Sequence, residues 1–288
     1  MPVNGINPYL LLSLAAIFLY LTAGVAVWRR LGSGQPWSRG AKALVRGIGF
    51  AALALHTRLL YHTLYHARLL SLGLSNVTSL VAWAVALIFL LTSLRKPIEN
   101  LAIFIMPTAA ASIVLQWEWP SRPTKTTASV WLFAHLVVSI LAYSLLSIAV
   151  VQAMMLAIQE RRLHGKHAGR SLRMLPPLQT METLMFQMLA IGFALLTLTL
   201  VSGLFFSEQL FGRPLVWSHH IVLAFFAWVV FAILLIGRWR FGWRGQQAVR
   251  WTFAGFVLLL FAYLGTQFVL EVTLARHSPG HPPLTRSH

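Results

Sequence analysis

Eight long apolar runs, separated by short polar segments, dominate this chain of 288 residues. Each has the roughly 17 to 25 residues that a helix needs to cross a hydrocarbon core of about 30 Å. The alternating pattern of a β-barrel is absent, so the backbone must satisfy its hydrogen bonds within helices. We therefore predict an all-α, polytopic bundle of about eight transmembrane helices. The runs lie near residues 7–28, 43–64, 76–94, 98–116, 128–158, 182–207, 217–237 and 249–274.

The composition supports an integral membrane protein. Hydrophobic residues make up 58% of the chain and charged residues 10%, and the mean hydropathy is +0.72. A soluble domain of this length would need more polar surface. We expect one transmembrane domain over residues 1–275 and a disordered tail over residues 276–288, where prolines and glycines occur without an apolar run.

The basic residues predict the orientation, because short cytoplasmic loops collect Lys and Arg. Sixteen of the 23 basic residues fall in the segments after the first, third, fifth and seventh runs. Both termini are therefore expected outside the cytoplasm. The net charge of +17 is divided among four membrane-proximal loops, a distribution that favours contact with anionic lipids and argues against nucleic-acid binding. These residues are Arg29, Arg30, Arg39, Lys42, Arg46, Arg95, Lys96, Arg161, Arg162, Lys166, Arg170, Arg173, Arg238, Arg240, Arg244 and Arg250.

Missing residue types exclude several chemistries. The chain has no cysteine and no aspartate, and its six acidic residues are all glutamates. Thiol exchange and thiolate metal sites are therefore ruled out. Magnesium–phosphate chemistry and paired-carboxylate acid–base catalysis have almost no side chains to use. An ATPase or a hydrolase is disfavoured.

The eleven histidines are the strongest functional signal. An ionisable side chain at membrane depth is costly without a partner or a water-filled cavity, so it marks a candidate functional site. The predicted orientation places His56 and His135 in the outer half of the membrane. His219 and His220 begin the seventh helix at the outer edge. Two histidines from different helices could clamp haem iron. Alternatively, each could make an interhelical hydrogen bond or meet water and headgroups.

Other residues near the outer boundary have two interpretations as well. Trp217, like Trp117, Trp119 and Trp131, could cover a porphyrin face or belong to the interfacial aromatic belt. Arg58 could pair with a haem propionate or extend toward the headgroups. Ser139 and Tyr143 follow His135 at intervals of four residues and predict a polar stripe that faces protein or a cavity.

Several short motifs follow one another along the chain. They are His135-x3-Ser139-x3-Tyr143, Pro176-Pro177-Leu178, Glu182, Trp217, Ala227-Trp228, Gly242-Trp243-Arg244-Gly245 and Tyr263-x-Gly265. With these motifs the chain resembles the cytochrome c assembly protein family of the CcsA and CcmC type, most strongly from about 128 to 268. Within that family it is most similar to the shorter, eight-helix YpjD or HemX-like branch.

The resemblance implies a multi-pass protein of the bacterial inner membrane that binds b-type haem near the periplasmic side. Its partners would then be haem, membrane lipids, and other cytochrome c maturation proteins or apocytochrome c. His135 matches a ligand position of the family, and His56 matches only the HemX-like branch. His219 and His220 match loosely. The resemblance thus names His135 and His56 as iron ligands.

Two departures from the larger family members favour haem binding over independent catalysis. Their Trp-Asp-Pro-Lys-Glu segment is replaced here by Trp217-Ser218-His219-His220-Ile221, and their histidine before Gly-Trp-Arg-Gly is missing. The main hypothesis is a haem-binding protein of cytochrome c biogenesis or haem trafficking. The alternatives are a membrane regulator or scaffold of haem metabolism, and a divalent metal-ion transport or resistance protein, which the scarcity of carboxylates disfavours.

Overall fold

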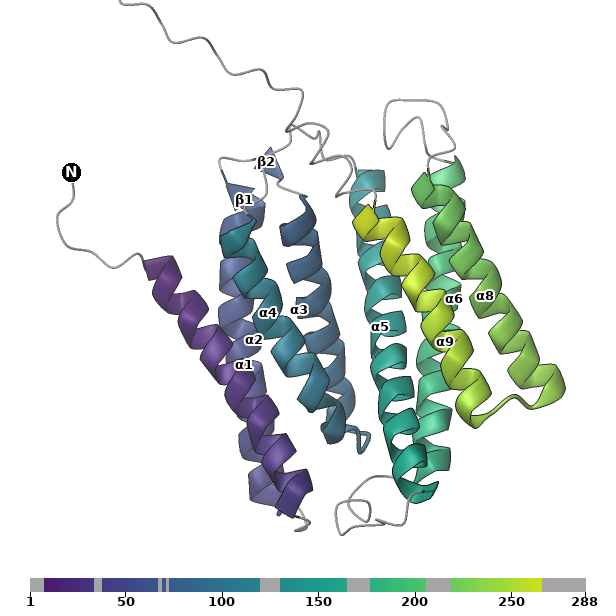
Figure 1. Cartoon of the computed structure of the whole chain (residues 1–288). Helices are drawn as coiled ribbons and strands as arrows, with labels where there is room; N and C mark the ends of the chain where they lie inside the picture. The colour runs from purple at the N-terminus through teal and green to yellow at the C-terminus, as the bar shows by residue number, and fades with distance from the viewer. Residues whose placement is uncertain are drawn as a thin grey trace, which may run out of the picture.

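A computed structural model shows an all-helical bundle whose long helices run nearly side by side (Figure 1). The α-helices in the described part of the chain are α1 (Pro8–Ser33), α2 (Arg39–Leu64), α3 (Leu74–Ser93), α4 (Ala102–Glu118), α5 (Val130–His164), α6 (Leu178–Phe205), α8 (His219–Phe241) and α9 (Gly245–Leu260). Shorter elements are the two-residue strands β1 (Tyr65–His66) and β2 (Leu69–Leu70), a 3-10 turn η1 (Glu99–Leu101) and a π-helical turn η3 (Phe261–Gly265). The structure describes residues 8–33, 38–66, 69–70, 73–119, 130–164, 177–205 and 219–265.

The predicted all-α class is confirmed. Seven helices within these ranges are long and apolar enough to cross a membrane. The eighth predicted span is shorter as an α-helix, because α9 has 16 residues before the backbone changes to the π-helical turn η3. Helix α9 also begins at Gly245, four residues before the predicted run. The predicted tail at 276–288 lies outside the described residues.

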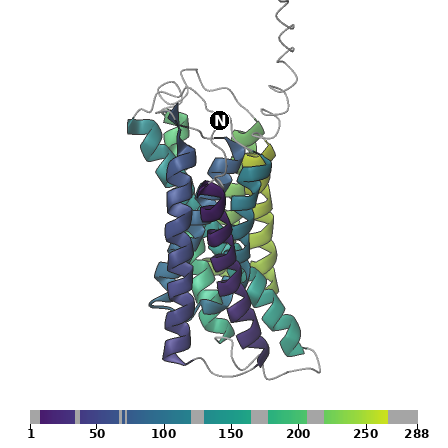
Figure 2. The same ribbon diagram turned by 90° about the vertical axis from the view of Figure 1, so that its left-hand side faces the viewer.

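The helices form two groups of four. Helix α1 contacts α2 and α4, and α3 contacts the same two helices, which closes an N-terminal bundle. Helix α5 contacts α6 and α9, and α8 contacts the same two, which closes a C-terminal bundle in which α5 and α8 are diagonal. The two bundles meet mainly where α3 packs against α5. Figure 2 shows the same parallel arrangement from the side.

Helix α1 shows how one face is selected for burial. Ala16, Tyr20 and Ala23 are at most 1% exposed and recur every three or four residues, the spacing of one helical face. Phe18, on the opposite face, is 68% exposed. An apolar side chain on that face meets lipid in a transmembrane helix, so apolar residues on the outside are expected.

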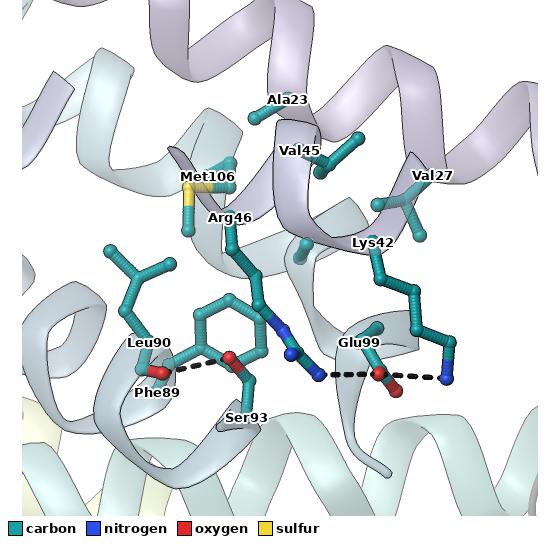
Figure 3. Close-up of a pocket in the computed structure, with 11 residues that line it drawn as sticks. Ala23, Val27, Lys42, Val45, Arg46, Phe89, Leu90, Ser93, Glu99 and Met106 are labelled. Atoms are coloured by element: carbon teal, nitrogen blue, oxygen red, sulfur yellow. Dashed lines mark hydrogen bonds and ion pairs between the residues drawn. The ribbon is translucent and has the colours of Figure 1, made fainter. Parts of the chain in front are cut away.

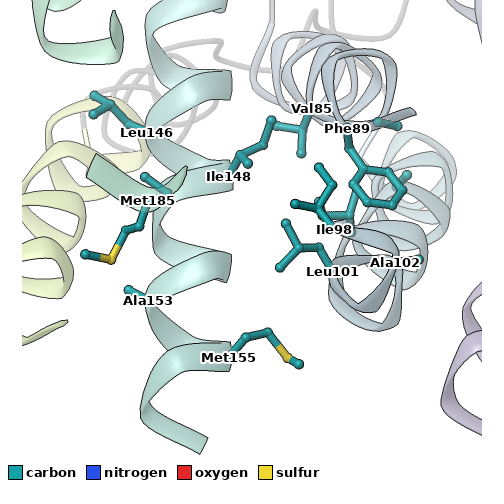
Figure 4. Packing of buried hydrophobic residues seen from close by; sticks show 14 of the residues in the cluster. Val85, Phe89, Ile98, Leu101, Ala102, Leu146, Ile148, Ala153, Met155 and Met185 are labelled. Atoms are coloured by element: carbon teal, nitrogen blue, oxygen red, sulfur yellow. The ribbon is translucent and has the colours of Figure 1, made fainter. Parts of the chain in front are cut away.

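Close approach of backbones tightens the contact between α5 and α6. A Cβ added to Gly192 of α6 would lie 2.9 Å from Cγ of Leu146 in α5, so only glycine fits there. On the other side of α5, Ile148 points toward Val85 of α3, as Figure 4 shows. Helix α5 therefore packs against α6 on one side and α3 on the other, and these contacts position its N-terminal end, which carries His135.

Candidate functional site

His135 lies in the first turns of α5, and its imidazole is held by α6. Its Nδ1 is 2.8 Å from Oγ of Ser202 in α6, and the Ser202 hydroxyl donates to the carbonyl oxygen of Thr199 at 3.1 Å. A serine hydroxyl has one proton, so when it is directed to Thr199, Ser202 accepts the hydrogen bond from Nδ1–H. This arrangement favours the tautomer that leaves a lone pair on Nε2.

The rest of the His135 ring is positioned by packing. A Cβ added to Gly203 of α6 would lie 3.7 Å from Cε1 of the ring, so the imidazole rests against the α6 backbone. The side chain is half-buried, and Nε2 makes no hydrogen bond to any residue in the described ranges. A neutral imidazole with one nitrogen held and the other free is the usual arrangement of a metal-binding histidine.

The predicted polar stripe that continues from His135 along α5 makes its contacts within the protein. The Ser139 hydroxyl donates to the carbonyl oxygen of His135 at 2.7 Å, so it is used within α5. The Tyr143 ring lies edge-on to the Tyr263 ring of η3, with centroids 5.9 Å apart. Tyr143 therefore joins α5 to η3, the turn that follows α9.

An aromatic stack lies between α6 and α8, deeper in the same bundle. The Trp228 ring is stacked on Phe193 and on Phe225, with centroid separations of 5.5 and 5.8 Å. Its indole N–H donates to Oγ1 of Thr197 at 2.9 Å. The stack gives the C-terminal bundle a rigid aromatic wall below the level of His135.

His56 lies in the N-terminal bundle, away from the helices that hold His135. It is 0% exposed, and both of its ring nitrogens have partners. The Tyr20 hydroxyl of α1 is 3.2 Å from Nδ1, and the Ser79 hydroxyl of α3 is 2.8 Å from Nε2. His56 thus joins three helices by hydrogen bonds, the alternative that the sequence left open. Iron ligation would require one of these bonds to break.

The remaining candidates lie at helix ends or beyond the described residues. Arg58 is exposed on α2, with its guanidinium carbon 5.9 Å from the Tyr61 ring centroid. His219 and His220 begin α8, and their side chains lie outside the description, as does Trp217. Helices α5 and α8 begin at the same end of the C-terminal bundle (Figure 1). The fold therefore brings His135 and the start of α8 to one end of one bundle.

The Gly-Trp-Arg-Gly motif forms the turn between α8 and α9. Gly242 and Gly245 have φ angles of 66° and 56°, which other residues rarely adopt. The Trp243 ring folds back on Gly237 of α8, where an added Cβ would lie 2.4 Å from Cε3 of the indole. The motif therefore has a structural role here.

Two polar contacts join that turn to the neighbouring helices. Arg238 donates to Oε1 of Glu182 in α6 at 2.7 Å and to the carbonyl oxygen of Trp243 at 3.2 Å. Gln246 of α9 donates to Oε2 of Glu160 in α5 at 3.0 Å. Glu182 and Glu160 thus hold the C-terminal bundle together at the end opposite His135.

The partners Ser202, Tyr20 and Ser79 were missed at the sequence level. Each is a polar residue inside an apolar run, and that was the signal that could have pointed to them. Within the described ranges, no group of three or more His, Cys, Asp or Glu side chains could hold a metal ion.

The fold and the site define a polytopic helical membrane protein that holds an oriented histidine at one end of its C-terminal bundle. The model of the family "Cytochrome C assembly protein" matches residues 44–274. This chain belongs to that family, which confirms the resemblance inferred from the motifs.

Individual relatives agree with this assignment. The chain is 32% identical to the inner membrane protein YpjD of Escherichia coli (strain K12) over 203 residues, which covers 70% of this chain and 76% of YpjD. It is 26% identical to the cytochrome c biogenesis protein CcsA of Prochlorococcus marinus (strain MIT 9515) over 196 residues, or 60% of this chain and 62% of CcsA. Its similarity to these proteins supports a multi-pass membrane protein.

A solved structure shares the fold. The cytochrome c heme lyase CcmF superposes with a TM-score of 0.64 at 18% identity. The match covers 98% of this chain and 53% of CcmF, so the chain spans about half the length of that protein. At this identity the likeness shows the fold alone.

Proposed function

We propose that this protein binds b-type haem at the outer end of its C-terminal bundle, in the inner membrane of a bacterium, for cytochrome c biogenesis or haem trafficking. The observation that carries the proposal is the arrangement of His135, whose Nδ1 is held by Ser202 while Nε2 keeps a lone pair and makes no hydrogen bond within the described residues. The names of the relatives, a cytochrome c biogenesis protein and a cytochrome c heme lyase, support the same class of role.

The chemistry of the surrounding residues fits this cofactor. Haem supplies an iron atom that accepts imidazole as an axial ligand. His135 would hold the iron through Nε2, and Ser202 would fix the ring orientation. The Trp228 stack adds an apolar wall between α6 and α8. A second ligand would come from the start of α8, at the same end of the bundle, by His220 or His219.

The other candidates have defined places in this proposal. Trp217 is two residues before the start of α8 and would cover a porphyrin face. Arg58 lies on α2 of the N-terminal bundle, which packs against α1 and α3, so it ranks last as the partner of a propionate. His56 would be a ligand only after one of its bonds to Tyr20 or Ser79 is broken, so we rank it below His135. The protein partners would be apocytochrome c or other maturation proteins.

A visible spectrum of the detergent-purified protein, expressed with ample haem, tests the proposal. The wild type should show a Soret band, and His135→Ala should lose most of it because iron loses its oriented ligand. The double substitution His219→Ala/His220→Ala should shift the band, since the second axial ligand changes. His56→Ala is the matched control, because it removes a histidine from the other bundle and should leave the Soret position unchanged.

Several outcomes would contradict haem binding at this site. A wild type without a Soret band would refute it, as would a His135→Ala band equal to that of the wild type. Tight uptake of a transition metal that depends on the same histidines would favour metal transport instead. Co-purification of a cytosolic enzyme with a haem-free protein would favour a regulatory scaffold.

A further inference from the structure

Two cations share one carboxylate in the N-terminal bundle, at the end of the molecule that is farther from His135. Lys42 Nζ lies 3.1 Å from Oε1 of Glu99, and Arg46 Nη2 lies 2.9 Å from the same oxygen. Both cations come from the first turns of α2, and Glu99 begins η1. Figure 3 shows the two side chains reaching Glu99 from either side. The group therefore carries one positive charge beyond neutrality.

A cavity lies beside this charged group, and its other walls are apolar. It opens to the outside, and the part that it encloses is only about 20 Å³, roughly the room that one water molecule needs. Side chains from α1, α2, α3 and α4 line it, among them Val27, Val45, Phe89 and Met106. In Figure 3 these side chains surround the space next to Arg46. An acyl chain would therefore lie along the apolar side chains at the mouth of the cavity and would not enter it.

Arg46 has a donor that no group in the described part of the chain uses. Its Nη2 is engaged by Glu99, but its Nε is buried and has no hydrogen-bond partner among the residues described. A buried N–H of a guanidinium without an acceptor is costly. An external group with strongly accepting oxygens would satisfy it and would also balance the extra positive charge.

The position of the group along α2 is that of lipid headgroups. Helix α2 has 26 residues, so it is about 39 Å long, against about 30 Å for the hydrocarbon core. Lys42 is the fourth residue of this helix, about 4.5 Å from its start, which places it at the edge of a centred core. The exposed Arg95 and Lys96 lie at the same end of the bundle. Basic pockets between transmembrane helices are typical binding sites for anionic headgroups.

We propose that this pocket binds an anionic glycerophospholipid. Lys42 and the free Nη donors of Arg46 hold the phosphate, Nε reaches it when the guanidinium turns outward, and one acyl chain lies over the apolar cavity. Glu99 acts as the built-in counterion when the lipid is absent and keeps both cations in place. This site is independent of haem binding, because it lies in the other bundle and at the other end.

Native mass spectrometry of the full-length, delipidated protein tests the proposal with two probes, dioleoyl-phosphatidylglycerol and dioleoyl-phosphatidylcholine. The wild type should bind the anionic lipid at least about fivefold more tightly, because charged hydrogen bonds contribute on this scale. Lys42→Gln/Arg46→Gln should abolish this preference. Glu99→Gln should preserve or increase it, since the competing carboxylate is neutralised.

Matched variants distinguish lipid binding in the pocket from a general attraction between positive charge and anionic lipid. Arg95→Gln/Lys96→Gln removes two exposed cations at the same end and should keep the preference. Val45→Phe fills the apolar part and should weaken phosphatidylglycerol binding, with the thermal unfolding of each variant checked against the wild type. Inorganic phosphate, added as a competitor, should displace little lipid if the acyl chain contributes.

Equal binding of the two lipids by the wild type would overturn the proposal. So would an unchanged preference for the anionic lipid in folded Lys42→Gln/Arg46→Gln, or loss of that preference in folded Glu99→Gln. Displacement of the lipid by inorganic phosphate at similar concentration would show a free-anion site instead.

Discussion

Replacing Ser202 by alanine tests whether the hydrogen bond to Nδ1 prepares His135 for iron. The substitution removes one oxygen on α6 and leaves the His135 side chain intact. The ring then loses the acceptor 2.8 Å from Nδ1, so neither its orientation nor its tautomer is fixed by α6. Gly203 continues to support the ring at Cε1, so the imidazole stays near its place.

The expected size of the effect follows from this single contact. One side-chain hydrogen bond contributes about 0.5–1.5 kcal/mol net. Loss of a partner that orients a metal-bound histidine typically costs about 10- to 100-fold in affinity. That range corresponds to about 1.4–2.8 kcal/mol, so the orientation and tautomer contribute at least as much as the bond itself. We expect Ser202→Ala to raise the Kd for haem about 10- to 100-fold.

Titration of haem into the purified apoprotein, followed at the Soret band, measures this Kd. Ser139→Ala is the matched control, because its hydroxyl donates to the His135 carbonyl oxygen at 2.7 Å and does not touch the ring. It should change the Kd less than about threefold, the scale of a fraction of one hydrogen bond. The reasoning fails if Ser202→Ala binds haem as tightly as the wild type, or if both serine variants weaken binding equally.

Two further substitutions test the packing. Gly237→Ala would place a Cβ 2.4 Å from the Trp243 ring and should destabilise the protein by about 1–3 kcal/mol. In the control variant Gly32→Ala the new Cβ meets no atom within 4 Å, so its stability should not fall. Thermal unfolding in detergent compares the two variants. Equal unfolding temperatures would refute the close-packing argument. Ser79→Ala leaves Nε2 of the buried His56 without its partner and should cost about 1–3 kcal/mol of stability. Haem affinity should stay unchanged, so a fall in affinity at unchanged stability would make His56 the ligand.

The number and positions of the helices follow from the sequence, because a helix must cross the hydrocarbon with few polar groups. The run near 43–64 became α2 (Arg39–Leu64), and the run near 182–207 became α6 (Leu178–Phe205). The last run deviated, because hydropathy does not register the change of backbone to a π-helical turn at Phe261. The family could also be predicted, since its motifs are local in the sequence and the match over residues 44–274 confirms it.

The partners of each helix were decided only by the tertiary structure. In a soluble protein a polar face marks the outside, but a transmembrane helix meets lipid with apolar residues and meets other helices with apolar residues too. Hydropathy therefore does not distinguish the buried Tyr20 from the exposed Phe18 on α1. The division into two four-helix bundles, which separates His56 from His135, has no counterpart in the pattern of the runs.

The histidines at membrane depth could be selected from the sequence, because an imidazole there is costly and therefore unusual. Whether a ring nitrogen is free could not be inferred. Ser202 is 67 residues from His135, and Tyr20 and Ser79 are 36 and 23 residues from His56. Hydrogen bonds over such separations exist only once the helices have packed. The sequence alone thus determined which side chains are chemically able to bind iron, and packing decided that His135 keeps a nitrogen available while His56 uses both.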